Sequence, residues 1–129
     1  MLYQETTDKI IKAFYDVYNE LGFGFLEKVY ENSMFIELSA LGLKCQRQKP
    51  INVYYKNEKV GEYFADIIVE DKIIVELKAA ETIAVEHELQ LINYLKATGI
   101  EVGLLLNFGK KPQIKRKIYT TKKNQRGSV

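Results

Sequence analysis

Two short apolar runs, residues 73–78 and 102–108, flank a segment with helical periodicity, and this arrangement constrains the fold more than any other feature. The intervening helix is predicted from about residue 83 to residue 98, and Gly99 stops it. A strand–helix–strand connection favours parallel strands, and a continuous apolar run is typical of a strand buried on both faces. The chain is therefore predicted to contain a covered parallel strand pair.

The remaining segments extend this pair into a larger sheet. Helical spacing of apolar residues predicts helices at about residues 4–21 and 26–40. Strands are predicted at about residues 44–56 and 60–69, with turns at residues 57–58 and 70–72 that make an antiparallel meander with residues 73–78. Alternation in residues 114–118 predicts an edge strand. The predicted fold class is α/β, with a mixed sheet flanked by helices in the order ααβββαββ.

Length and composition indicate one domain with a real core, because the chain has 129 residues of which 47% are hydrophobic. We assign residues 1–120 to this domain and residues 121–129 to a basic, frayed tail. A single cysteine excludes an internal disulfide and a multi-cysteine metal site. No apolar run approaches the roughly 18 residues that span a membrane, and a signal-peptide layout is absent. We expect a reducing, cytoplasmic location and no membrane partner.

Positive charge is concentrated near the C-terminus. Residues 110–129 contain eight of the 19 Lys and Arg residues and none of the 17 Asp and Glu residues. Such a segment can contact phosphates, and the candidate residues are Lys115, Arg116, Lys117, Lys122 and Lys123. The alternative is an edge strand whose lysines prevent aggregation, followed by a frayed end.

A carboxylate–lysine set interrupts the two central strands. Asp66 lies in the apolar run before the loop, and Glu76 and Lys78 project from one face of the next strand. A three-residue loop at residues 70–72 pairs Asp66 with Glu76, whereas a two-residue turn places them on opposite faces. Two carboxylates at such a short distance repel each other, and a divalent cation between them removes the repulsion. The alternative is an edge-strand charge beside a solvated ion pair.

Two helices carry polar residues that can reach the same region. Gln90 and Tyr94 are four residues apart and share one face of the predicted third helix. Glu27 stands in the first turn of the second helix, where an acidic side chain is also favoured by the helix dipole alone. Gln90 and Tyr94 can likewise be an ordinary helix flank. Both sets therefore have a structural explanation beside the functional one.

Several short motifs together resemble a known family. The segment GFLEKVY, with Gly24, Glu27 and Tyr30, matches the signature of the GxxExxY proteins, a branch of the PD-(D/E)xK nuclease superfamily. The resemblance continues through Asp66, the ELKA motif at residues 76–79, and the segments at residues 90–99 and 103–109. Ala65 stands where the superfamily name has proline.

The resemblance implies a restriction-endonuclease-like core and a function for each matched residue. Glu27, Asp66 and Glu76 are implied as metal ligands, with Leu77 included in the metal site. Lys78 is implied as the catalytic lysine, and Gln90 and Tyr94 as helix-borne supports. Oxygen ligands without a Cys/His set favour Mg²⁺ or Mn²⁺ over Zn²⁺. The expected activity is phosphodiester hydrolysis by a metal-dependent nuclease.

Two other functions remain open from the sequence. One is a nucleic-acid-binding or protein-interaction module on a nuclease-like fold without turnover, and the other is hydrolysis of a different phosphoester. We favour DNA over RNA as the nucleic acid. Because a chain of this size has little surface for reading bases, a homodimer or a protein partner also stays open.

Overall fold

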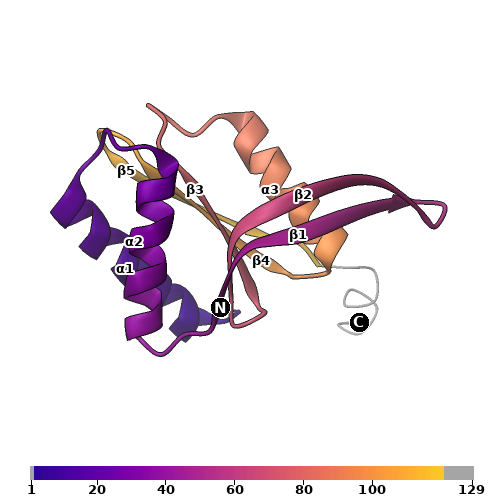
Figure 1. Ribbon diagram of the computed structural model, residues 1–129, viewed down its shortest axis with the longest axis horizontal. Helices are drawn as coiled ribbons and strands as arrows, with labels where there is room; N and C mark the ends of the chain where they lie inside the picture. The colour runs from indigo at the N-terminus through magenta and orange to yellow at the C-terminus, as the bar shows by residue number, and fades with distance from the viewer. Residues whose placement is uncertain (1, 121–129) are drawn as a thin grey trace.

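The protein is described from a computed structural model, in which residues 2–120 are placed. A five-stranded mixed sheet has the strand order β1-β2-β3-β4-β5, and three helices cover it (Figure 1). The bounds are α1 Gln4–Leu21, α2 Glu27–Ala40, β1 Cys45–Tyr55, β2 Glu58–Val69, β3 Ile73–Lys78, α3 Val85–Thr98, β4 Val102–Phe108 and β5 Pro112–Ile118. The predicted order ααβββαββ and the α/β class are confirmed.

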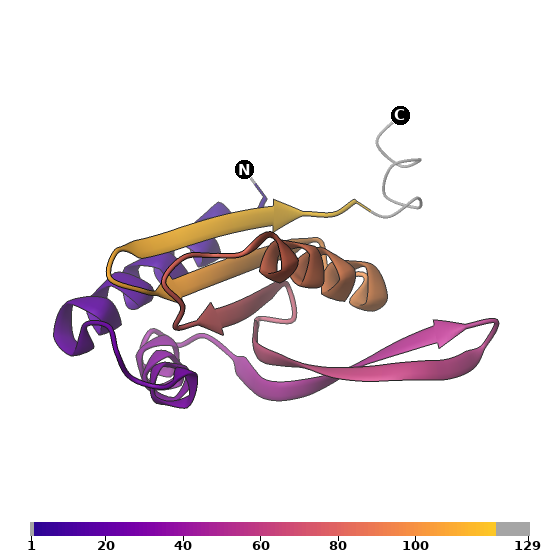
Figure 2. The same ribbon diagram turned by 90° about the horizontal axis from the view of Figure 1, so that it is seen from above.

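The helices form layers on opposite faces of the sheet. Strand β3 pairs parallel with β4 through the α3 crossover, as predicted, and every other neighbouring pair is antiparallel. Helices α1 and α2 pack against one face, and α3 packs against the other (Figure 2). In β3, Val75 and Leu77 face α1 and α2, whereas Ile74 faces α3. Period-two alternation therefore puts Glu76 and Lys78 on the α3 side.

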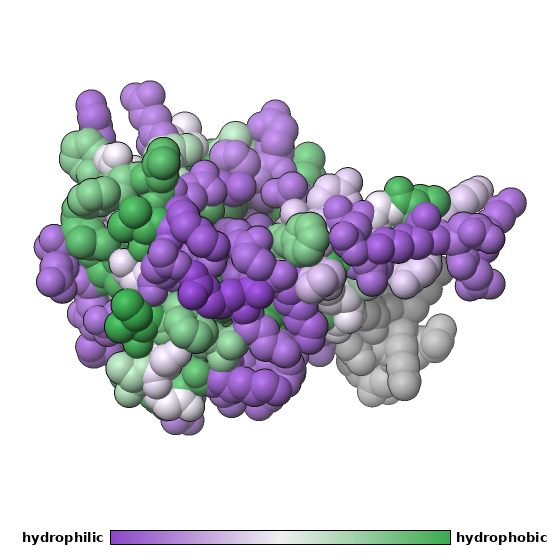
Figure 3. Space-filling view, viewed as in Figure 1, coloured by the Kyte–Doolittle hydropathy of each residue, from purple (hydrophilic) through white to green (hydrophobic). Residues whose placement is uncertain are grey.

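Apolar residues at helical spacing explain how α1 and α2 attach to the sheet. Ile10, Phe14 and Val17 follow one stripe of α1 and are buried against residues of α2 and β4. Tyr30 and Met34 do the same in α2. On the face seen in Figure 3, hydrophobic residues gather over this helical layer, whereas hydrophilic residues predominate on the projecting hairpin.

Strands β1 and β2 form a hairpin that extends well beyond the body of the protein (Figures 1 and 2). The predicted turn at residues 57–58 is wrong by one position, because the turn residues are Lys56 and Asn57, both with positive φ. Their left-handed conformations match the right-handed twist of a two-residue hairpin turn. Strand β2 consequently begins at Glu58, two residues earlier than predicted.

Candidate active site

The register of β2 with β3 places Asp66 and Glu76 opposite each other. Val69 pairs with Ile73 across the loop at residues 70–72, so the three-residue loop required by the sequence analysis is present. The ladder continues to the pair Ile67–Val75 and stops there. One further step along the same register brings Asp66 opposite Glu76. The two carboxylates therefore stand at the point where the pairing of β2 with β3 ends.

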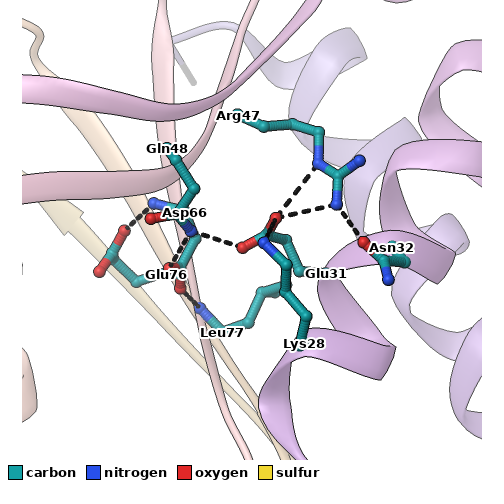
Figure 4. A network of polar contacts seen from close by, with 8 residues as sticks. All are labelled: Lys28, Glu31, Asn32, Arg47, Gln48, Asp66, Glu76 and Leu77. Atoms are coloured by element: carbon teal, nitrogen blue, oxygen red, sulfur yellow. Dashed lines mark hydrogen bonds and ion pairs between the residues drawn. The ribbon is translucent and has the colours of Figure 1, made fainter.

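Side chains replace the backbone hydrogen bonds at this end of the ladder (Figure 4). The backbone N–H of Asp66 donates to Oε2 of Glu76, with an N···O distance of 2.8 Å. The backbone N–H of Leu77 donates to Oδ2 of Asp66, also at 2.8 Å. Each carboxylate is thus anchored by the opposite strand, and the hydrogen bonds fix the two acidic groups next to each other.

Both carboxylates are held in an environment that disfavours their charge. Glu76 is 5% exposed, and burial followed by the negative charge of Asp66 raises its pKa to about 8. The charge of Glu27 raises this pKa further, while Lys78 lowers it. Burial also raises the pKa of Asp66, against the opposing effects of the Leu77 N–H and Lys78. A cation that neutralises both groups would offset this repulsion and part of the burial penalty.

The two other predicted metal-site residues lie at the edge of this pair. Glu27 is exposed in the first turn of α2, close enough for its charge to act on Glu76. The side chain of Leu77 is buried in the core beneath α1 and α2, so only its backbone faces the carboxylates. Within residues 2–120, no three His, Cys, Asp or Glu side chains form a ready metal-holding group. The structure thus brings Asp66 and Glu76 into contact and leaves Glu27 beside them.

The residues around Glu27 fix the start of α2. Tyr30 is fully buried, stacks on Phe108 with ring centroids 4.0 Å apart, and donates its hydroxyl hydrogen to the carbonyl of Gly22 at 2.7 Å. Gly24 has a φ of 109°, a conformation that side-chain-bearing residues rarely adopt. The glycine and tyrosine of the GxxExxY motif therefore shape the loop that presents Glu27 to the sheet.

Glu31 is a buried member of the site that the sequence analysis missed. The residue is 3% exposed, and its carboxylate accepts hydrogen bonds from Lys28, Arg47 and Gln48 (Figure 4). Burial raises the pKa of Glu31, but these hydrogen bonds outweigh burial and hold the pKa below its usual range. The Gln48 amide also lies 3.4 Å from Oδ1 of Asp66, so it connects Glu31 to the carboxylate pair.

Lys78 is followed by a segment that Asn107 holds in place. The side chain of the fully buried Asn107 accepts from the backbone N–H of Ala80 and donates to the carbonyl of Ala80, both at 2.9 Å. A Cβ atom on Gly109 would lie 2.5 Å from the same carbonyl oxygen. Asn107 and Gly109 together form a clamp on this segment. The Tyr18 hydroxyl lies 2.7 Å from the carbonyl oxygen of Gly109 and so connects α1 to the clamp. Asn107 and Gly109 therefore fix the path of the chain as it leaves the site.

The polar stripe on α3 faces a groove beside the carboxylates. Gln90 and Tyr94 both line this groove, which β1 and β2 close on its other side. Burial, and then the charges of Glu76 and Asp66, raise the pKa of Tyr94 to about 12. Tyr94 thus stays protonated at neutral pH and lies within the electrostatic reach of the acidic pair.

The basic residues of β5 are divided between the two faces of the sheet. Lys117 forms a salt bridge with Glu88 of α3, with an N···O distance of 2.6 Å, and Lys115 is exposed. Arg116 points to the other face, where its Nη2 donates to the carbonyl of Leu2 at 2.8 Å. The candidate residues Lys122 and Lys123, like the predicted tail, lie outside the described residues.

The fold and the site together define an α/β protein of the nuclease-like class, with an Asp, a Glu and a Lys at the end of a central strand pair. Residues 4–117 match the PD-(D/E)XK nuclease superfamily, and the chain belongs to that superfamily. The wider structural class expected from the sequence is thereby confirmed.

One similar solved structure is described as "Crystal structure of SSO0001". It shares 16% sequence identity with this chain, with a TM-score of 0.59 over 77% of this chain and 53% of that one. This likeness concerns the fold, and the chain spans about half the length of that protein. A comparison with curated proteins gave no match. None of the helices within residues 2–120 is long and apolar enough to cross a membrane.

Proposed function

We propose that the protein is a metal-dependent nuclease of the GxxExxY branch that hydrolyses phosphodiester bonds of nucleic acid. The observation that carries the proposal is the hydrogen-bonded pair of Asp66 and Glu76, with Lys78 two residues beyond Glu76 on the same strand face. A purely structural role does not account for a buried Glu76 and a half-buried Asp66 that lie side by side with raised pKa values. Membership of the superfamily supports the same function.

Asp66 and Glu76 fit a hard divalent cation because both offer carboxylate oxygens and neither forms a salt bridge within residues 2–120. These two residues would hold Mg²⁺ or Mn²⁺, and Glu27, which is exposed in the first turn of α2, would contribute a third carboxylate. When bound, the cation supplies charge neutralisation at the phosphate and a lowered pKa for a coordinated water.

The protein's own residues supply the remaining functions. The Lys78 ammonium offsets the charge that develops on the phosphate and orients the attacking water. Gln90 and Tyr94, which line the groove on the α3 side, would support the site with the donor groups of an amide and a hydroxyl. The Glu31 network holds Gln48 against Asp66 and so limits the positions that this carboxylate can take. DNA as the preferred substrate, phosphate contacts from the tail and a cytoplasmic location stay predictions.

The test is a cleavage panel of labelled DNA and RNA, single- and double-stranded, with Mg²⁺, Mn²⁺ or EDTA. We expect products with Mg²⁺ or Mn²⁺ and none with EDTA. Lys78→Ala should abolish most cleavage, and Lys72→Ala, which removes an exposed lysine from the preceding loop, is the matched control. Binding without metal-dependent products from the wild type would instead favour the module without turnover.

A further inference from the structure

A groove of about 810 Å³ lies between the β1–β2 hairpin and α3. Its volume is within the range of pockets that hold small organic ligands, roughly 300–1,000 Å³. The hairpin contributes Asn52, Tyr54 and Tyr63 to the lining, and α3 contributes Gln90, Asn93 and Tyr94. Aromatic rings and side-chain amides thus line both walls of one groove.

Two tyrosines join this groove to the candidate active site. The rings of Tyr63 and Tyr94 have centroids 5.7 Å apart and are tilted by 46°. Tyr94 is buried and feels the charges of Glu76 and Asp66, whereas Tyr63 is 47% exposed. The exposed ring of Tyr63 therefore offers a stacking surface to a molecule whose adjoining part reaches the carboxylates.

We propose that this groove binds an unpaired nucleotide of the substrate, whose base stacks on Tyr63 next to the scissile phosphate. The proposal rests on the proposed nuclease function and specifies its substrate as nucleic acid with single-stranded character at the cleavage site. Base–aromatic stacking accepts any base, because every base has a π-face. The groove would accordingly select strandedness and be tolerant of sequence.

The polar groups of the groove fit the edges of a base. The amides of Asn52, Gln90 and Asn93 each supply both donors and acceptors. Oδ1 of Asn52 is buried and has no hydrogen-bond partner among the residues that the structure describes. An exocyclic amine of a base can provide the missing donor after a small rotation of this side chain.

The charges of the groove also favour a base over a phosphate backbone. The charged side chains among its lining residues are those of Lys96 and Glu86, which have opposite signs. Phosphate binding requires clustered positive charge and is strongly salt-dependent. Stacking requires an accessible base face, which neighbouring base pairs cover within a duplex. The groove therefore suits an unpaired base and contributes little to the salt dependence of binding.

The test measures binding of a labelled single-stranded oligonucleotide and of its duplex, in EDTA and again in Ca²⁺. Tyr63→Ala is compared with the wild type and with Tyr63→Phe, which keeps the ring. The control is Tyr55→Ala, since Tyr55 lies on the same hairpin, is 64% exposed and does not line the groove. Melting curves of all variants verify that each one is folded.

We expect Tyr63→Ala to weaken single-strand binding by roughly five- to a hundredfold, the range for loss of one stacked base. The factor should be the same at low and high salt, and Tyr63→Phe and Tyr55→Ala should bind like the wild type. The wild type should bind the single strand more tightly than the duplex. Unchanged single-strand affinity in folded Tyr63→Ala, or equal losses for both substrates, overturns the proposal.

Cleavage assays separate this proposal from the function on which it rests. If the wild type cleaves with Mn²⁺ but Tyr63→Ala binds single strands normally, the groove proposal fails and the nuclease function stands. If single-strand binding depends on Tyr63 but the wild type never cleaves, the nuclease function fails and the groove is a binding site without turnover.

Discussion

Replacing Glu76 with glutamine should stabilise the metal-free protein at alkaline pH. The carboxylate of Glu76 is buried beside Asp66, and its pKa is raised from 4.5 to about 8. A carboxyl group with a raised folded-state pKa binds its proton more tightly in the folded state than in the unfolded state. Its contribution to stability is therefore complete below pH 4.5 and is lost as the pH rises toward 8.

The size of this stability difference follows from the rise in the pKa of Glu76. One pKa unit corresponds to about 1.4 kcal/mol, so ionisation of Glu76 between pH 5 and pH 8 costs at most about 4 kcal/mol. The glutamine side chain of the variant Glu76→Gln has no charge to bury, and its amide oxygen can still accept from the Asp66 N–H. The variant should consequently gain at least about 1 kcal/mol over the wild type at pH 8 and much less at pH 5.

The assay is urea denaturation in EDTA at several pH values, followed by the same series with Mn²⁺. Manganese should stabilise the wild type at pH 8 by mass action and should stabilise Glu76→Gln much less. Glu81→Gln is the control, because Glu81 is an exposed acid that follows the same strand. A stability difference between Glu76→Gln and the wild type that is identical at pH 5 and pH 8 would refute the reasoning.

Four further outcomes are expected. Glu31→Gln should lower the free energy of unfolding by about 1–3 kcal/mol at pH 7, measured by urea denaturation, because it weakens charged hydrogen bonds. Since the pKa of Glu31 is lowered in the folded state, this difference from the wild type should shrink as the pH falls through the folded-state pKa. Gly109→Ala should lower the melting temperature by forcing a clash with Ala80, at a cost of roughly 1–3 kcal/mol, and an unchanged melting curve would contradict the clamp. Lys78→Ala should leave the melting curve unchanged and reduce cleavage by about 10²–10⁴-fold, without rescue by Lys78→Arg. Deleting residues 122–129 should flatten the salt dependence of duplex DNA binding by a slope of roughly 0.9 for each lost phosphate contact, whereas an unchanged slope indicates a passive tail.

The sheet was predictable because its information is local. The sequence left two registers open, and the three-residue loop at residues 70–72 is the one that brings Asp66 opposite Glu76. The parallel pairing of β3 with β4 follows from the length of the helical crossover. These features depend on neighbouring residues, which a single sequence displays directly.

The support around the carboxylates was less accessible from the sequence. Glu31 is four residues after Glu27 and shares its helical face, a signal that could have been used. Its burial, however, depends on Arg47 and Gln48 from a strand that follows the helix. Gln48 has a φ of 49°. A positive φ is usually signalled by glycine or asparagine, and the glutamine at this position gives no such signal. Asn107 gave a clearer signal, because it is a lone polar residue within an apolar run.

The clamp at Gly109 has a consequence for the order in which the protein matures on the ribosome. Asn107 and Gly109 hold the segment after Lys78, and Tyr18 contacts the carbonyl of Gly109 from α1. The residues on which the proposed chemistry depends are therefore synthesised well before the residues that lock them in place. A nascent chain that ends before Asn107 carries Asp66, Glu76 and Lys78 without this clamp. Such a chain should lack the proposed activity, which we expect only once β4 has emerged and joined the sheet.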